Sequence, residues 1–170
     1  LERERLLSVT DTWLWSSAER LRGYFDALDE AGIVFDPLLV SNCRLNEAAT
    51  VDSVRAMLAL PDPPTAVLTT ETTATVGVLR ATRDSRFAYP GDISVIGFDD
   101  SSWASVMEPP LTMIAQPMRE LGRVAAELAF ARIGGDRGDA AVETLPATFN
   151  SRASVTAPRP QVSLSDDDGR

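Results

Sequence analysis

The side chains best suited to chemistry stand in three loops that follow predicted strands. They are, in chain order, Trp13, Trp15, Arg20, Glu71, Asp99 and Asp100. Arginine and carboxylate groups form paired hydrogen bonds with vicinal hydroxyls, and an indole ring covers the C–H surface of a sugar. Because ligands of open parallel sheets bind outside the carboxyl ends of the strands, this mixture indicates a site for a polyhydroxylated small molecule.

Each of these residues also has a plainer structural interpretation. Two adjacent carboxylates after a strand are typical of a turn or a helix cap, and Arg20 lies where a solvated arginine of a first helical turn would lie. Glu71 is a first-turn acid that the helix dipole favours. The tryptophans can pack in the core or at its rim. On the residues alone, both interpretations stay open.

Enzyme chemistry is poorly supported by the composition. All 16 basic residues are arginine, and the chain has no lysine and no histidine. This excludes Ser-His-Asp or Cys-His nucleophiles, zinc bound by imidazole and a P-loop lysine. Asp99, Asp100 and Glu71 could hold Mg²⁺, but no glycine-rich phosphate loop accompanies them. A two-carboxylate glycosidase is allowed, but no spacing selects it. We therefore expect no enzyme, cofactor or metal.

Charge and hydropathy limit the partners of this chain. Its 170 residues carry a formal charge of −9 and have a pI near 4.5. Such an acidic chain is unsuited to binding the phosphate backbone of a nucleic acid by itself. The apolar content of 44% is enough for one core, and no apolar run approaches the ~18 residues of a membrane span. A single cysteine, Cys43, fits a reducing cytoplasm.

Strands and helices alternate along the chain. Predicted strands cover residues 6–9, 33–40, 65–69, 93–98 and 142–149. Predicted helices cover residues 16–31, 47–60, 73–84 and 118–133, the first starting at Ser16 and ending before Gly32, the second capped by Asn46. The alternation predicts an α/β fold, an open parallel sheet with helices on both faces, followed by a disordered tail at 158–170.

Two motifs carry a resemblance to a known family. They are Ile-Ser-Val-Ile-Gly-Phe-Asp-Asp at 93–100 and Pro-Pro-Leu-Thr-Met-Ile-Ala-Gln-Pro at 109–117. Weaker matches follow the same order, at 19–24, at 118–125 and in Ser-Arg-Ala-Ser at 151–154. Together they resemble the effector-binding domain of lactose-repressor-type (LacI/GalR) transcription regulators, a type I periplasmic-binding-protein-like fold.

The resemblance implies a domain map and a function. Residues 1–113 would form the C-terminal lobe, 114–157 would cross back to the N-terminal lobe, and the helix-turn-helix and most of the N-terminal lobe would be absent. The implied function is sensing of a small-molecule effector, a sugar or a similar polyhydroxylated molecule. The protein would be a cytoplasmic homodimer that controls operator DNA through the missing helix-turn-helix. The alternative is a transport-associated sugar-binding protein of the same fold.

The resemblance also implies roles for individual residues. Arg20, from the Arg-x-x-Gly motif, and Asp99, the first Asp of Gly-Phe-Asp-Asp, would contact the effector. Glu71 replaces an asparagine that contacts ligand in the family, which implies either a more basic or more hydroxylated effector or a degenerate site. Gln116 would lie near the ligand, at the crossover between lobes. Trp13 and Trp15 would replace an aromatic that many members carry near the position of Leu45.

Overall fold

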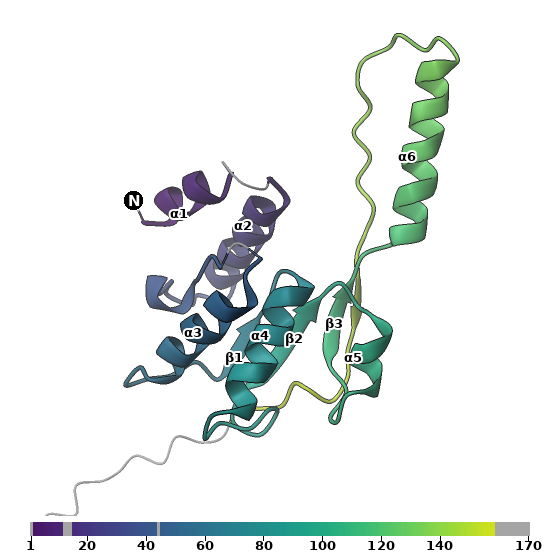
Figure 1. Cartoon of the computed structure of the whole chain (residues 1–170). Helices are drawn as coiled ribbons and strands as arrows, with labels where there is room; N and C mark the ends of the chain where they lie inside the picture. Colours follow the sequence, from purple (N-terminus) through teal and green to yellow (C-terminus); the bar gives the residue numbers. More distant parts are fainter. Residues whose placement is uncertain (1, 12–14, 44, 159–170) are drawn as a thin grey trace, which may run out of the picture.

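A four-stranded open sheet lies at the centre of the chain, with helices packed against it (Figure 1). The computed structural model describes residues 2–11, 15–43 and 45–158. In spatial order the strands are β1 (Ala66–Leu68), β2 (Ser94–Phe98), β3 (Thr112–Ala115) and β4 (Thr148–Asn150). The helices of the described residues are α1 (Glu2–Asp11), α2 (Trp15–Glu30), the 3₁₀ turn η1 (Pro37–Leu39), α3 (Glu47–Leu58), α4 (Thr72–Arg83), α5 (Ser102–Val106) and α6 (Met118–Ile133).

The sheet is mixed rather than fully parallel. β1 pairs with β2 and β2 with β3 in parallel, whereas β4 runs antiparallel to β3. The open α/β sheet is therefore confirmed, with a difference in its last strand. That difference arises because the chain leaves β3 through α6, reverses at the far end of this helix and returns alongside it to β4 (Figure 1).

The core lies between the sheet and the pair α3 and α4. Its members are Val51, Val54, Leu58, Val78, Ala81, Ile93, Val95, Ala104, Leu111 and Met113. The predicted Asn46 cap is confirmed, because its side-chain oxygen accepts a hydrogen bond from the Ala49 amide at 3.1 Å. Gly77 lets α4 approach α3 closely, since a Cβ there would lie 2.7 Å from the Cβ of Thr50.

Two predicted strands near the amino end are wrong. Residues 6–9 belong to α1, a segment of glutamate, arginine and leucine, which are good helix formers. The Arg3 guanidinium binds the Asp29 carboxylate at 2.8 and 2.9 Å and lies 5.0 Å from the centre of the Phe25 ring, so α1 docks on α2. Residues 33–40 hold η1 instead of a strand, because the Asp36 carboxylate caps this turn by accepting from the Leu38 amide.

The bounds of several other elements differ from the predicted bounds. β1 forms as predicted but is the edge of the sheet among the described residues, so Ala66 and Leu68 are exposed rather than buried. The last strand starts at Thr148, and residues 142–147 form no strand. α2 begins at Trp15, so Ser16 is not its cap, while Gly32 ends this segment at φ +66° as predicted. Residues 159–170 of the predicted disordered tail lie outside the described residues.

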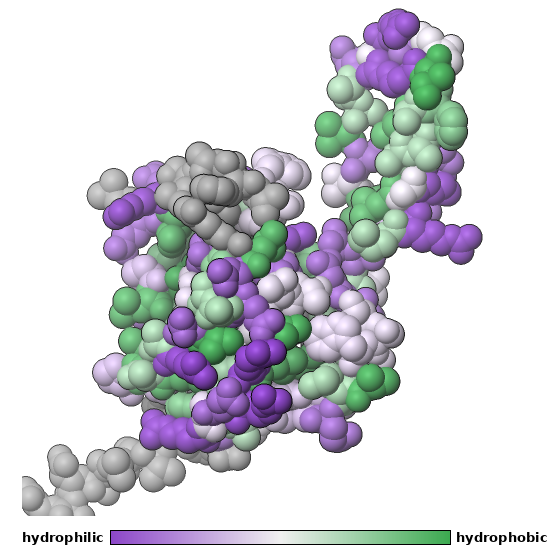
Figure 2. Space-filling view, in the orientation of Figure 1, coloured by the Kyte–Doolittle hydropathy of each residue, from purple (hydrophilic) through white to green (hydrophobic). Residues whose placement is uncertain are grey.

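α6 and the return segment project from the sheet as an arm (Figure 1). No residue of α6 is buried, and Phe130 and Ile133 are 71% and 81% exposed. Figure 2 shows apolar side chains along this arm. A stripe of exposed apolar residues on one helix indicates a surface that another part of a protein covers.

The helices of the described residues are short or polar compared with a membrane span. None combines the length and the apolar character that crossing a membrane requires.

Replacing Gly77 with alanine tests the close contact of α3 and α4. The added Cβ would collide with Thr50, which lies on a helix and cannot move alone, so we expect unfolding free energy to fall by about 1–3 kcal/mol. Urea denaturation of the 170-residue chain measures this loss. Gly23→Ala is the control, because nothing lies within 4 Å of its Cβ and a helical alanine gains about 0.5–1 kcal/mol over glycine. Equal effects of the two substitutions would contradict this packing.

Candidate functional site

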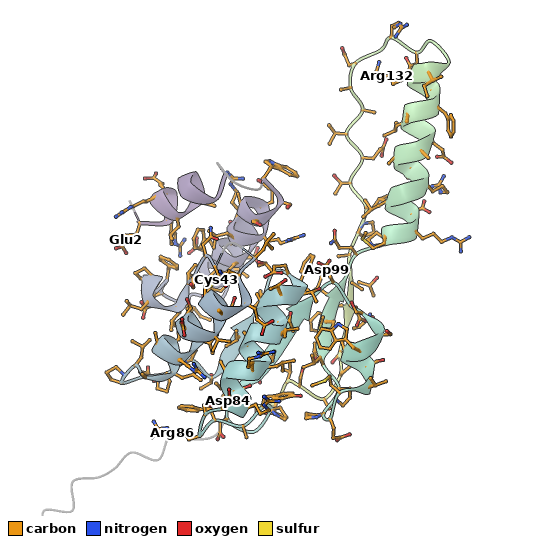
Figure 3. The ribbon with its side chains drawn as sticks, viewed as in Figure 1. Glu2, Cys43, Asp84, Arg86, Asp99 and Arg132 are labelled. Atoms are coloured by element: carbon orange, nitrogen blue, oxygen red, sulfur yellow. The ribbon has the colours of Figure 1, made fainter. Side chains whose placement is uncertain are left out.

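Four of the six predicted site residues lie at the carboxyl ends of the parallel strands or reach there. Glu71, Asp99 and Gln116 follow β1, β2 and β3, and Arg20 reaches the same edge from α2. Figure 3 labels Asp99 at this edge, where the arm of α6 leaves the sheet. All four side chains are half-buried, so each is both positioned and accessible.

Arg20 bridges β1 and β2. Its Nη1 donates a hydrogen bond to the Thr70 carbonyl at 2.9 Å, and its guanidinium lies 4.0 Å from the centre of the Phe98 ring. Stacking on an aromatic face leaves further N–H groups of the fork directed outward. The plain interpretation of Arg20 as a solvated side chain is therefore wrong.

Glu71 caps α4. Its two carboxylate oxygens accept hydrogen bonds from the Thr73 and Ala74 amides, both at 2.7 Å. These amides have no partner within the helix, and the helix dipole favours a negative charge at this end. A structural role of Glu71 at the start of α4 is thus confirmed, although Glu71 is the N-cap and not a residue of the first turn. Its contact with a ligand stays a prediction.

Asp99 has a backbone conformation that side chains other than glycine rarely adopt, with φ +66°. Its amide donates to the Ile114 carbonyl at 2.9 Å, and its carboxylate accepts from the Gln116 amide nitrogen at 2.5 Å. Asp99 and Gln116, which were predicted separately as site residues, are therefore in direct contact. Through this pair, the end of β2 is linked to the point where the chain enters the arm.

Asp100 belongs to a cluster that the sequence analysis missed. Arg152 donates to both of its carboxylate oxygens, at 2.9 and 2.6 Å, and the Asn150 amide donates to one of them at 2.7 Å. The hydrogen bonds from Arg152 lower the pKa of the Asp100 carboxyl; burial opposes this shift and Asn150 adds to it. The sequence signal for this cluster is the Ser-Arg-Ala-Ser motif at 151–154, which contains Arg152.

No hydrogen bond or ring contact of the described residues brings Trp15 to this edge. Trp15 is the first residue of α2 and is 71% exposed. It precedes Arg20 by five residues, about 7 Å along the helix axis. Trp13 lies outside the described residues. Both remain predictions as ligand-contacting side chains.

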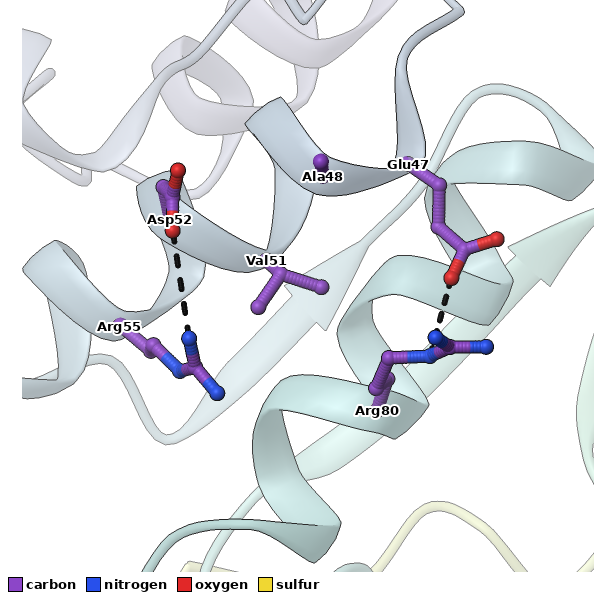
Figure 4. Close-up of a pocket in the computed structure, with 6 residues that line it drawn as sticks. All are labelled: Glu47, Ala48, Val51, Asp52, Arg55 and Arg80. Atoms are coloured by element: carbon purple, nitrogen blue, oxygen red, sulfur yellow. Dashed lines mark ion pairs between the residues drawn. The ribbon is translucent and has the colours of Figure 1, made fainter.

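Two surface hollows lie away from this edge. The first, of about 400 Å³, follows α3 and α4 and is lined by charged side chains (Figure 4). Arg80 Nε lies 2.9 Å from Glu47 Oε1, and Arg55 lies 3.6 Å from Asp84, so these charges join the two helices. The second, of about 490 Å³, lies between α4 and α5, and its apolar lining includes Val76, Leu79, Phe87, Tyr89, Trp103 and Met107. Among the described residues, no three histidine, cysteine or acidic side chains group as metal ligands would.

The chemistry of the strand-end site is that of hydrogen-bonded recognition. A guanidinium, two carboxylates and a carboxamide offer both donors and acceptors, and the Phe98 ring supplies an apolar surface. Such a set recognises hydroxyl groups in paired geometry.

Comparison with domain families finds one match. Residues 4–155 match the family described as periplasmic binding protein-like domain.

Curated relatives of the chain are transcriptional repressors and regulators. It is 38% identical over 142 residues to the "Probable opine utilization operon repressor" of Rhizobium rhizogenes, covering 83% of this chain and 72% of that protein. It is 36% identical over 116 residues to the transcriptional repressor CytR of Escherichia coli, covering 68% of this chain and 34% of CytR. The transcriptional regulator CelR of Thermobifida fusca is 36% identical over 121 residues, which cover 71% of this chain and 36% of CelR.

Solved structures agree with these relatives. A complex of the regulator CelR with cellobiose superposes with a TM-score of 0.74 at 35% identity, covering 80% of this chain and 42% of that one. The transcription regulator CcpA of Lactococcus lactis gives a TM-score of 0.73 at 28% identity, covering 82% and 51%. The chain thus spans about a third to a half of the length of most of these proteins.

Replacing Glu71 separates its capping role from other roles. Glu71→Ala leaves the Thr73 and Ala74 amides without their acceptor, so we expect a loss of about 0.5–2 kcal/mol in unfolding free energy. Glu71→Asn keeps a good capping oxygen and should stay close to the parent chain. Thermal and urea denaturation of both variants measures the difference. If alanine and asparagine give the same stability, the cap contributes nothing.

Proposed function

Because this chain belongs to the periplasmic-binding-protein-like domains of LacI-family transcription regulators, we propose that it senses a polyhydroxylated effector and thereby controls operator binding by the complete protein. The observation that carries this proposal is that Gln116 binds Asp99 at the end of β2, beside the crossover to the arm. Arg20 lies next to this pair, over the ring of Phe98, the residue that precedes Asp99. A ligand held there would touch the point at which two lobes can rotate against each other.

The class of effector follows from the site. Arg20 and Asp99 offer a donor fork and an acceptor pair to vicinal hydroxyls, and Trp15 offers an exposed indole to a sugar face. The structure of CelR bound to cellobiose supports a sugar. Glu71, with its charge in place of the family's asparagine, favours a basic or densely hydroxylated ligand if it turns from its cap toward the pocket.

The domain map remains part of the proposal. We assign residues 1–113 to the C-terminal lobe and 114–157 to the segment that crosses to the N-terminal lobe and back. The exposed apolar stripe of α6 supports this division, because the N-terminal lobe would cover it (Figure 2). In the complete protein the remainder of that lobe and a helix-turn-helix would precede this chain.

The partners and the site of action follow from the regulator class. Operator DNA would be bound through the helix-turn-helix, in the cytoplasm, and not by this acidic chain. We propose a homodimer in which the hollow between α4 and α5 receives the second copy. Its lining is mostly apolar, and it includes Arg83 and Glu108, the opposite charges that a self-complementary surface needs.

Two other function classes are less well supported. A transport-associated sugar-binding protein would share the fold, but the curated relatives named above are repressors and regulators. The same relatives are not enzymes, and we propose that this chain catalyses no reaction.

Substitutions at the strand ends test the effector site in the complete gene product. A panel of mono- and disaccharides that includes cellobiose is titrated by calorimetry. For the sugar that binds, Arg20→Ala or Asp99→Ala should weaken binding by about 1–3 kcal/mol, the loss expected for charge-assisted hydrogen bonds. Arg22→Ala, on the same helix, should leave affinity unchanged. Unaltered affinity in both site variants would refute the pocket.

Substitutions on α6 test the domain map. In the 170-residue chain, Phe130→Ala and Ile133→Ala should change unfolding free energy by less than about 0.5 kcal/mol, because both side chains are exposed. In the complete gene product each should cost about 2–5 kcal/mol, as for buried residues. Arg119→Ala, also on α6, is the control for both proteins. Equal, small effects in the two proteins would show that no lobe covers this helix.

A further inference from the structure

The conformation of Asp99 has a cost that other contacts must offset. A left-handed backbone at a residue with a Cβ costs about 1–3 kcal/mol and persists only when its surroundings impose it. The Asp99 amide donates a hydrogen bond to the Ile114 carbonyl at 2.9 Å. The Ser101 hydroxyl donates to the Asp99 carbonyl at 3.2 Å. These neutral contacts involve only the loop itself and β3.

The stronger restraint acts on the next residue. The Asp100 carboxylate accepts three hydrogen bonds, two from the Arg152 fork and one from Asn150. Its side chain is only 11% exposed and that of Arg152 is 21% exposed, so this ion pair is largely shielded from water. A bidentate arginine–carboxylate pair fixes orientation as well as distance. With Asp100 fixed, the peptide that joins it to Asp99 loses its freedom to rotate.

Arg152 is itself anchored to the sheet. Its Nη1 also donates to the Leu111 carbonyl at 2.7 Å, and its amide donates to the Thr112 hydroxyl at 2.9 Å. The guanidinium therefore connects the start of β3 with the loop after β2. Arg152 lies two residues after the end of β4, so it also marks the return of the chain from the arm.

We propose that Arg152 is a positioning residue of the effector site: by holding Asp100 against β3 and β4, it fixes the backbone of Asp99 and aims the Asp99 carboxylate at the strand ends. Describing Asp99 as an effector contact rests on the proposed function. The positioning itself is a property of this chain. Both strands that connect to the arm are then linked to this loop. Gln116, after β3, binds Asp99, and Arg152, after β4, binds Asp100. A movement of the arm would therefore change the position of the Asp99 carboxylate.

Hydrogen exchange in the 170-residue chain tests the positioning without any ligand. The probe is the Asp99 amide, which is bonded to Ile114. The reference is the Thr69 amide, which donates to the Ile96 carbonyl at 3.0 Å at the same end of the sheet, away from Arg152. In Arg152→Leu, we expect exchange at Asp99 to quicken about tenfold or more relative to Thr69, because local opening no longer breaks charge-assisted bonds.

Two further variants keep this test decisive. Arg152→Lys keeps the charge but not the bidentate fork, so it should give a smaller increase at Asp99 and serves alone if the leucine variant does not fold. Arg123→Leu is the matched control, because Arg123 also pairs with two carboxylates, those of Glu120 and Glu127, but on the arm. It should not change exchange at Asp99.

The outcomes separate the possible roles of Arg152. A selective increase at Asp99 supports positioning. Equal increases in the exchange rates at Asp99 and Thr69 overturn it, because Arg152 would then stabilise the whole fold. No increase at either amide also overturns it, because Arg152 would then restrain neither site. In the complete gene product, titrated with the panel sugar that binds, the affinity loss caused by Arg152→Lys should disappear in the Asp99→Ala background. If no sugar binds, the proposed function fails while the exchange result still decides the positioning.

Discussion

The closing segment of the chain holds the two central strands together, and the rest of the sheet depends on it. Ser154 has no exposed surface; its hydroxyl donates to the Val95 carbonyl at 2.6 Å and accepts from the Thr112 amide at 2.7 Å. The Val95 amide in turn donates to the Ser154 carbonyl at 2.9 Å. Buried backbone groups without partners are costly. Because Ser154 satisfies groups on both β2 and β3, it stabilises their pairing from a position far along the sequence.

This constraint fixes the two strands that carry the candidate site. Val95 and Met113 are buried in the core, so β2 and β3 deliver Asp99 and Gln116 to one edge at a fixed separation. β1, by contrast, is an edge strand, and α2 reaches the sheet through Arg20. A binding site built on the rigid strands, with its outer parts less tightly packed, can retain its geometry while the parts around it move.

How far the sequence predicts this molecule depends on the range of the interactions involved. Asn46, Gly32 and the helices near them are local features. Asp99 and Gln116 belong to motifs at strand ends, whereas Arg20 belongs to an Arg-x-x-Gly motif within α2. Residues 6–9 and 33–40 read as strands because of their apolar content, but a strand forms only against a partner, which no local pattern reveals. The Asp100–Arg152 pair spans 52 positions, so only the folded chain brings it together.

Because α6 projects from the sheet, a rotation at its first turn would displace its far end. A helix of 16 residues is about 24 Å long, and α6 is joined to the sheet next to Gln116. A rotation of about 15° at that joint, the size of the rotations that accompany switching in oligomeric proteins, displaces its far end by about 6 Å. A small rotation beside Gln116 would thereby become a displacement larger than a water molecule at the far end of α6.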